Sequence, residues 1–93
     1  MLVGVLRVEL HLPMAMSLKD KRSALKSLKD QLHGRFNVAV ADLDPNEKWQ
    51  RASLGAVTIG GDRASVEGCL RRIVEWVEQN RFVEVVRVEQ ELW

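Results

Sequence analysis

Hydrophobic and polar residues alternate over the first part of the chain. Leu6, Val8 and Leu10 fall on one side of this segment, and the charged residues Arg7 and Glu9 lie between them. A period of two residues is typical of a β-strand that buries one face. The pattern therefore predicts a half-buried strand over residues 3–12, which ends at Pro13.

The spacing of apolar residues changes to a helical period after Ser17. Leucines then recur at positions that share one side of a helix. Ser17 is a suitable N-cap, and Asp20, three residues further on, is its expected capping-box partner. Gly34 is expected to end the helix in the left-handed conformation. These signals predict a first helix over residues 17–34.

A second helical pattern follows the Gly60-Gly61 turn. Asp62 is the predicted N-cap, and Asn80-Arg81 marks the end of the helix. Charged residues three or four positions apart cover the outer face, as on many solvated helices. The predicted buried stripe has four members: Val66, Leu70, Ile73 and Val77. We assign this helix a structural role only.

Three further segments are predicted to be strands. The first begins near Phe36 and places Val38 and Val40 on the same side as that residue. The second covers about residues 52–59, and the third covers residues 82–92. Their β-branched and aromatic residues favour extended structure.

The resulting order, β-α-β-β-α-β, predicts an α+β fold. A split βαβ arrangement satisfies the right-handed crossover rule and places both helices on one face of a four-stranded antiparallel sheet. We therefore expect a ferredoxin-like sandwich with the strand order 4-1-3-2. Because 93 residues bury one modest core, residues 1–93 are expected to form a single domain.

This topology also predicts where a site would lie. The first two strands run in the same direction, so three segments gather at one end of the molecule. They are the loop after the first strand, the start of the first helix, and a connection over residues 43–51. We place the candidate site at that end.

Lys21 departs from the apolar pattern of the first helix. At about 100° per residue it lies within the leucine stripe, so it is expected to point toward the sheet. On the second strand, the inward series continues from Val40 to Asp42. Since a buried ammonium needs a partner or must extend to water, we predict a partly buried Lys21–Asp42 ion pair. The pair is either a binding or proton-transfer site or, as we favour, a structural salt bridge.

The first helix also carries a basic stripe. Its members fall within a sector of about 80° on the helix surface. Such a face can contact successive phosphates of a nucleic acid or an acidic protein surface, although many lysine-rich faces are only solvated. Asp30 borders the stripe and reduces its charge. The members are Lys19, Arg22, Lys26 and Lys29, with His33 at the end.

The net charge of +1 conceals an uneven distribution. Residues 1–37 contain seven Lys or Arg and three Asp or Glu, a balance of +4, whereas residues 38–93 contain seven and ten, a balance of −3. A basic half can steer an anionic partner. No stretch approaches the roughly 18 apolar residues of a membrane span, so we expect no membrane partner and a cytoplasmic location.

The sequence holds no recognisable catalytic, cofactor or metal motif. Neither histidine has a cysteine, histidine or carboxylate at ligand spacing, and Cys69 has no second cysteine to pair with. The strand at 52–59 lacks the aromatic residues of an RNA-recognition sheet. We therefore expect a non-catalytic protein without cofactor or metal, and an enzyme with Lys21 as its base is the least favoured hypothesis.

Trp49 is a large aromatic residue in a polar connection. It either folds back to close the core or stands exposed as an interface anchor, and we expect it to close the core. Arg51 lies two residues further on, at the end of the same connection.

Three segments, in order along the chain, resemble a known family. The segments are Ser17-Leu18-Lys19-Asp20-Lys21-Arg22, Arg35-Phe36-Asn37-Val38, and Trp49-Gln50-Arg51 followed by Leu54-Gly55. They look like the YlxP-like family of small bacterial proteins. The chain departs from that family at Ala39 and Asp42, where serine and glutamate are usual.

The resemblance spans nearly the whole chain and implies the same fold as the pattern. It implies no activity, because the family is functionally uncharacterised. Genes of the family commonly neighbour those for translation initiation and ribosome maturation factors, which implies an RNA- or ribosome-associated role by association only.

We therefore expect a binding module for RNA or a ribonucleoprotein. The alternative is an oligomeric regulatory or protein-interaction module, in which the sheets or edges of a homodimer pair and Lys21, Asp42 and Trp49 line a small pocket. The candidate binding residues are Lys19, Lys21, Arg22, Lys26, Lys29, Asp42, Trp49 and Arg51.

Overall fold

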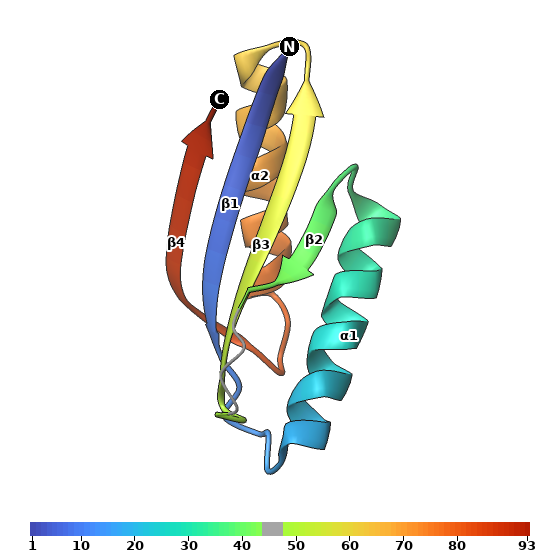
Figure 1. Ribbon diagram of the computed structural model, residues 1–93, viewed down its shortest axis with the longest axis vertical. Helices are drawn as coiled ribbons and strands as arrows, with labels where there is room; N and C mark the ends of the chain where they lie inside the picture. Colours follow the sequence, from blue (N-terminus) through green and yellow to red (C-terminus); the bar gives the residue numbers. More distant parts are fainter. Residues whose placement is uncertain (44–47) are drawn as a thin grey trace.

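The computed structural model describes residues 1–43 and 48–93. These parts of the chain form two helices and four strands, in the order expected from the sequence (Figure 1). The elements are β1 (Leu2–His11), α1 (Leu18–Arg35), β2 (Ala39–Asp42), β3 (Arg51–Gly60), α2 (Arg63–Glu78) and β4 (Glu84–Leu92).

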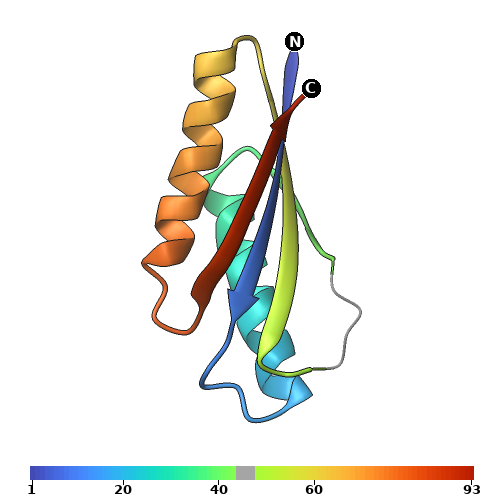
Figure 2. The ribbon, with the colours of Figure 1, turned by 90° about the vertical axis from the view of Figure 1, so that its left-hand side faces the viewer.

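The described strands form one antiparallel sheet. Its order is β2-β3-β1-β4, which reads 4-1-3-2 from the opposite edge, so β1 and β3 are the central strands. Both helices lie on the same side of this sheet, as the side view shows (Figure 2). The α+β class and the antiparallel sheet with two helices are therefore confirmed.

The hydrophobic core lies between the sheet and the helices. Leu6 and Leu10 of β1 are 1% exposed, as expected from the alternating pattern. α2 packs on the two central strands, whereas α1 packs on the short edge strand β2. The four predicted stripe residues of α2 are all buried. Each helix thus covers a different part of the sheet.

The first helix begins as predicted. The Ser17 side chain accepts a hydrogen bond from the backbone N–H of Asp20 at 3.1 Å, as an N-cap should. The Asp20 carboxylate accepts from the backbone N–H of Met16 at 2.9 Å. In the usual capping box this second hydrogen bond comes from the N–H of the N-cap residue, whereas here the donor is the residue before the N-cap.

The predicted end of the first helix is wrong. Gly34 has no positive φ, and α1 continues through it to Arg35. The cap is Phe36, which is extended and donates its backbone N–H to the carbonyl of Leu32 at 2.9 Å. Because Phe36 packs against the core, the chain leaves the helix in an extended conformation, and no left-handed residue is required.

The second helix agrees with its prediction at both ends. The Asp62 side chain accepts from the backbone N–H of Ser65 at 2.8 Å. That hydrogen bond is the main reason why the pKa of the Asp62 carboxyl lies below its usual value. The helix ends at Glu78, close to the predicted Asn80-Arg81 stop.

The outward sides of both helices are charged. On α2, Arg63 pairs with Glu67 at 2.6 Å, and Arg71 lies 4.0 Å from Glu75. Pairs of this kind stabilise a solvated helix face. Among the described residues, no helix is long and apolar enough to cross a membrane.

Candidate functional site

Segments that are distant in sequence meet at one end of the molecule. The loop between β1 and α1, the first turns of α1 and residues 48–50 lie together there, at the bottom of Figure 1. The backbone N–H of Leu12 donates to the carbonyl of Gln50 at 2.9 Å. The Gln50 side-chain amide donates to the carbonyls of Pro13 and Ala15, both at 3.3 Å. We call this region the loop end.

Lys21 is buried, as predicted from the helix pattern. Lys21 is 4% exposed and lies among the leucines of α1 that face the sheet. Its Nζ donates a hydrogen bond to the backbone carbonyl of Lys48 at 3.0 Å. A buried ammonium requires such acceptors, because burial removes its water. Lys21 therefore ties the start of α1 to the chain segment that precedes β3.

Asp42, the predicted partner of Lys21, lies at the last position of β2. It is opposite Leu54 in the register of the sheet, which is the side that carries the helices. Its side chain is nevertheless exposed, because β2 is an edge strand that ends there. The Lys21–Asp42 ion pair stays a prediction. The remainder of the connection, residues 44–47, lies outside the described residues.

Trp49 does not close the core, so that prediction is wrong. The residue is 49% exposed and lies in an open hollow of about 540 Å³. Core space beneath this end is already occupied by Leu10, Leu12 and Ala52, each 1% exposed. The other described residues around the hollow are polar: His11, Lys48, Gln50 and Arg51.

Three of these neighbours were not candidates in the sequence analysis. Lys48 and Gln50 flank Trp49 directly, and their position in a polar connection was the available signal. His11 comes from the far end of β1, and only the sheet register, which pairs it with Arg51, brings it here. Its Nδ1 lies 3.3 Å from a carboxylate oxygen of Glu84 on β4.

The basic stripe of α1 lies on the side of the helix that faces away from the core. Lys19, Arg22 and Lys26 are exposed, and Lys29 is half-buried. Lys26 Nζ donates to Asp30 at 2.9 Å. That bond, followed by the charge of Lys26, holds the pKa of the Asp30 carboxyl below its usual value. Asp30 therefore stays ionised and offsets the charge of Lys26.

The arrangement at the loop end can bind but lacks the groups of a metal centre. Within residues 1–43 and 48–93, His, Cys, Asp and Glu do not gather in threes that could hold a metal ion. What the loop end offers is an exposed indole next to two cationic side chains and one imidazole. Indole faces stack on planar groups, and the cations attract anions.

Comparison with known proteins places the chain in a family. A family model described as "Protein of unknown function (DUF503)" matches residues 3–90, and the chain belongs to that family. The chain is also 29% identical, over 86 residues, to "Uncharacterized protein YlxP" of Bacillus subtilis strain 168. That match covers 92% of this chain and 91% of the relative. The YlxP-like resemblance is confirmed, and neither description states an activity.

Proposed function

We propose that this member of the family is a non-catalytic, cytoplasmic module that binds single-stranded RNA, alone or within a ribonucleoprotein, on a ferredoxin-like scaffold. The binding surface consists of the loop end and the basic stripe of α1. The topology supports the scaffold, since a split βαβ arrangement leaves the β1–α1 loop and the chain before β3 at one end.

The exposed side chain of Trp49 carries the proposal. A tryptophan that is 49% exposed in an otherwise polar segment leaves apolar surface in contact with water, which is unfavourable in the free protein. Its polar surroundings include the cations Lys48 and Arg51. Single-stranded nucleic acids are bound by this combination, in which a base stacks on an aromatic ring and phosphates contact lysine or arginine.

The α1 stripe extends this surface. Lys29 lies ten positions after Lys19, which corresponds to about 15 Å along a helix. Lys19 and Arg22 belong to the first turns of α1 and therefore lie nearest the loop end. A single strand that stacks a base on Trp49 can pass its next phosphates along these cations.

Lys21 has a positioning role in this proposal. Its hydrogen bond to the Lys48 carbonyl holds the Lys48–Arg51 segment against α1. The segment then presents Trp49 outward in a defined place, which lowers the ordering cost of binding. Because Lys21 is buried, it is not itself expected to contact the RNA.

The same burial argues against a catalytic base at Lys21. A general base must come within hydrogen-bond reach of the proton that it removes. Lys21 is 4% exposed and its Nζ is engaged by a backbone carbonyl, so a substrate has little access to it. These observations support the non-catalytic form of the proposal.

Fluorescence anisotropy with a labelled single-stranded RNA, measured over a salt series, tests the proposal. We expect Trp49→Ala to weaken binding by about 1–3 kcal/mol, because one stacked base is lost. Lys19→Glu combined with Arg22→Glu should weaken binding and lower the salt slope by about 0.7 for each lost phosphate contact.

A matched control reverses two arginines of α2, Arg71→Glu with Arg72→Glu. It changes the net charge by the same amount on the other helix, so it should leave binding near that of the wild type. Equal loss in this control would show that only overall charge matters, and it would contradict the proposed surface. If the wild type binds no RNA even at low salt, the RNA proposal fails and the protein-interaction alternative replaces it.

A further inference from the structure

The second face of the sheet carries no helix within the described parts of the chain (Figures 1 and 2). Register pairs along β1 and β3 divide this open face into two halves. Val3 pairs with Ile59 and Val5 with Val57 in one half. In the other half the pairs are polar, and they continue toward the loop end. The open face is therefore apolar near the start of β1 and charged near its end.

The apolar half is exposed and hollowed. Val57 is 42% exposed, Ile59 51% and Leu43 44%. Val57 and Leu43 line an open hollow of about 450 Å³ over small residues of β2 and β3, among them Ala39, Ala41 and Gly55. Leu43 lies so close over the sheet that a Cβ on Gly55 would come within 2.8 Å of its Cδ1. Exposed apolar patches of this kind mark interaction surfaces.

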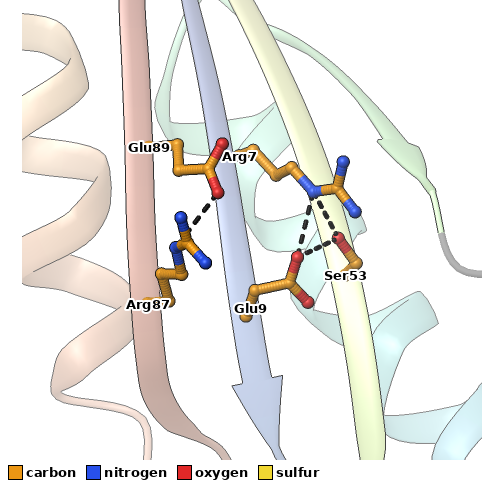
Figure 3. A network of polar contacts seen from close by, with 5 residues as sticks. All are labelled: Arg7, Glu9, Ser53, Arg87 and Glu89. Carbon is orange, nitrogen blue, oxygen red and sulfur yellow. Dashed lines mark hydrogen bonds and ion pairs between the residues drawn. The ribbon is translucent and has the colours of Figure 1, made fainter.

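The charged half is neutralised within the chain (Figure 3). Arg7 Nε donates to Glu9 Oε1 at 2.9 Å and to Ser53 Oγ at 3.2 Å. The Ser53 hydroxyl in turn donates to Glu9 at 3.1 Å, and Arg87 pairs with Glu89 at 3.1 Å. Groups that are already paired lose less when another surface covers them.

These features favour an uncharged, apolar occupant over a polyanion. The hollow is bordered by Glu89 and Glu91, which repel phosphates, and the only cation in its lining among the described residues is Arg7, which is held by Glu9. Trp93 pairs with Val3 at the edge of the apolar half and is 72% exposed, but its Nε1 donates to Glu91 at 2.8 Å, so its ring lies beside a carboxylate that repels phosphates. The surface that best complements valines, an isoleucine and a leucine around a hollow is another apolar sheet face.

We propose that a second copy of this chain covers the open face. A two-fold axis that runs between the two sheets brings the apolar halves together, so that Val57 and Ile59 of each copy pack near the hollow of the other. Such an interface uses the same patch twice, and an apolar patch is complementary to itself. The proposal does not rest on RNA binding, which concerns the loop end.

The size of the face agrees with a dimer. β1 and β3 have ten residues each, which at about 3.3 Å per residue makes them roughly 33 Å long. With strands about 4.8 Å apart, the face covers on the order of 500 Å² before side-chain relief is counted. A standard interface buries about 800 Å² of accessible surface on each partner. A dimer of ordinary size would therefore use the whole of this face, including the charge-neutralised half.

Sedimentation equilibrium over a wide concentration range tests the proposal with the full chain. The monomer mass is 10.6 kDa, and we expect the wild type to sediment at twice that value. Val57→Lys places a charge in the middle of the apolar half and should return the mass to that of the monomer. The matched control is Phe82→Lys, since Phe82 is 52% exposed and borders a separate hollow lined by residues of both helices.

A wild type that stays monomeric at every concentration would overturn the proposal. So would a dimer that survives Val57→Lys, or one that Phe82→Lys dissociates equally, because either result places the interface elsewhere. Circular dichroism checks that each variant is folded. If Val57→Lys does not fold, the double variant Val57→Thr with Ile59→Thr keeps the β-branched shape and should still weaken the dimer.

Discussion

The two helices cover the same sheet in different ways. α2 lies on the central strands β1 and β3 with a wholly apolar stripe, and its N-cap and stripe agree with the sequence pattern. α1 lies on the four-residue edge strand β2 and includes the buried Lys21 in its stripe. A hydrophobic helix face thus needs only a sheet beneath it, whereas a buried lysine needs an acceptor from elsewhere in the chain.

The acceptor comes from a segment 27 positions away. Lys21 reaches the Lys48 carbonyl, so α1 is linked to the loop end as well as to the sheet. The helices also meet near their C-terminal ends, where the Arg35 guanidinium lies 5.3 Å from the ring centroid of Trp76. We infer that α2 mainly stabilises the fold, while α1 also organises the candidate site. Four changes can break or sharpen this comparison.

Truncation of buried leucines should have the largest effect. Leu70→Ala in α2 and Leu28→Ala in α1 remove side chains that are 0% and 1% exposed, and each should cost about 2–5 kcal/mol of unfolding free energy. We expect the greater loss of unfolding free energy for Leu70→Ala, because the helix that carries Leu70 packs on the central strands β1 and β3. Urea unfolding followed by circular dichroism measures both. A greater loss for Leu28→Ala would contradict the assignment of the main stabilising role to α2.

Replacement of Lys21 separates its stem from its charge. Lys21→Ala should cost about 2 kcal/mol, because it leaves a cavity where the buried side chain packed. Lys21→Met keeps most of the apolar volume and should stay within about 1 kcal/mol of the wild type. The same urea experiment measures both free energies. If the two variants lose equal stability, the ammonium and not the stem stabilises α1.

Glycine-to-alanine changes should have a smaller effect, and in the opposite direction. Gly34→Ala should stabilise the protein by about 0.5–1 kcal/mol, since Gly34 is helical and a Cβ there would meet nothing within 4 Å. Gly68→Ala in α2 should gain less, because its Cβ would lie 3.2 Å from an Arg72 nitrogen. Thermal unfolding compares the two. A loss of stability in Gly34→Ala would mean that this position needs a glycine after all.

The smallest expected effect concerns pH. The Asp62 carboxyl has a lowered pKa in the folded protein, chiefly because the Ser65 N–H bonds to it. A lowered folded pKa contributes stability that is present above the unfolded value, near 3.8, and is lost as the pH falls through the folded value. Asp62→Asn keeps a capping oxygen without this titration, so its melting temperature should fall less steeply in acid.

Asp30 is the matched control on α1. Its pKa is lowered by the hydrogen bond and charge of Lys26, so Asp30→Asn should also flatten the acid limb of the stability curve. Melting temperatures recorded from neutral pH to below pH 3.8 give both profiles. Profiles identical to the wild type in both variants would show that neither carboxylate contributes to acid unfolding.

Much of the fold could be predicted because its signals are local. The alternation in β1, the stripe of α2 and the N-caps Ser17 and Asp62 each depend on residues a few positions apart. The end of α1 was misplaced because Gly34 competes with Phe36, which packs against the core and pulls the chain into an extended cap. Tertiary packing decides where the helix ends, and the residues around Gly34 do not reveal that packing.

The candidate site was only partly predictable for the same reason. The inward direction of Lys21 follows from helix geometry, but the identity of an acceptor at Lys48 does not. Trp49 could not be placed, since its exposure depends on whether the core beneath it is already full. The ring of polar residues around Trp49, including His11 from β1, depends on the sheet register.

By itself, the sequence determined which segments are helices or strands, which side of each is buried, and that a lysine enters the core. The tertiary structure alone decided where that lysine bonds, that Trp49 faces solvent, and that Arg7, Glu9 and Ser53 pair beside an apolar hollow. The first set depends on periodicity and caps within a few residues. The second set depends on how segments that are distant in sequence pack against one another, which the periodicity of a single segment does not indicate.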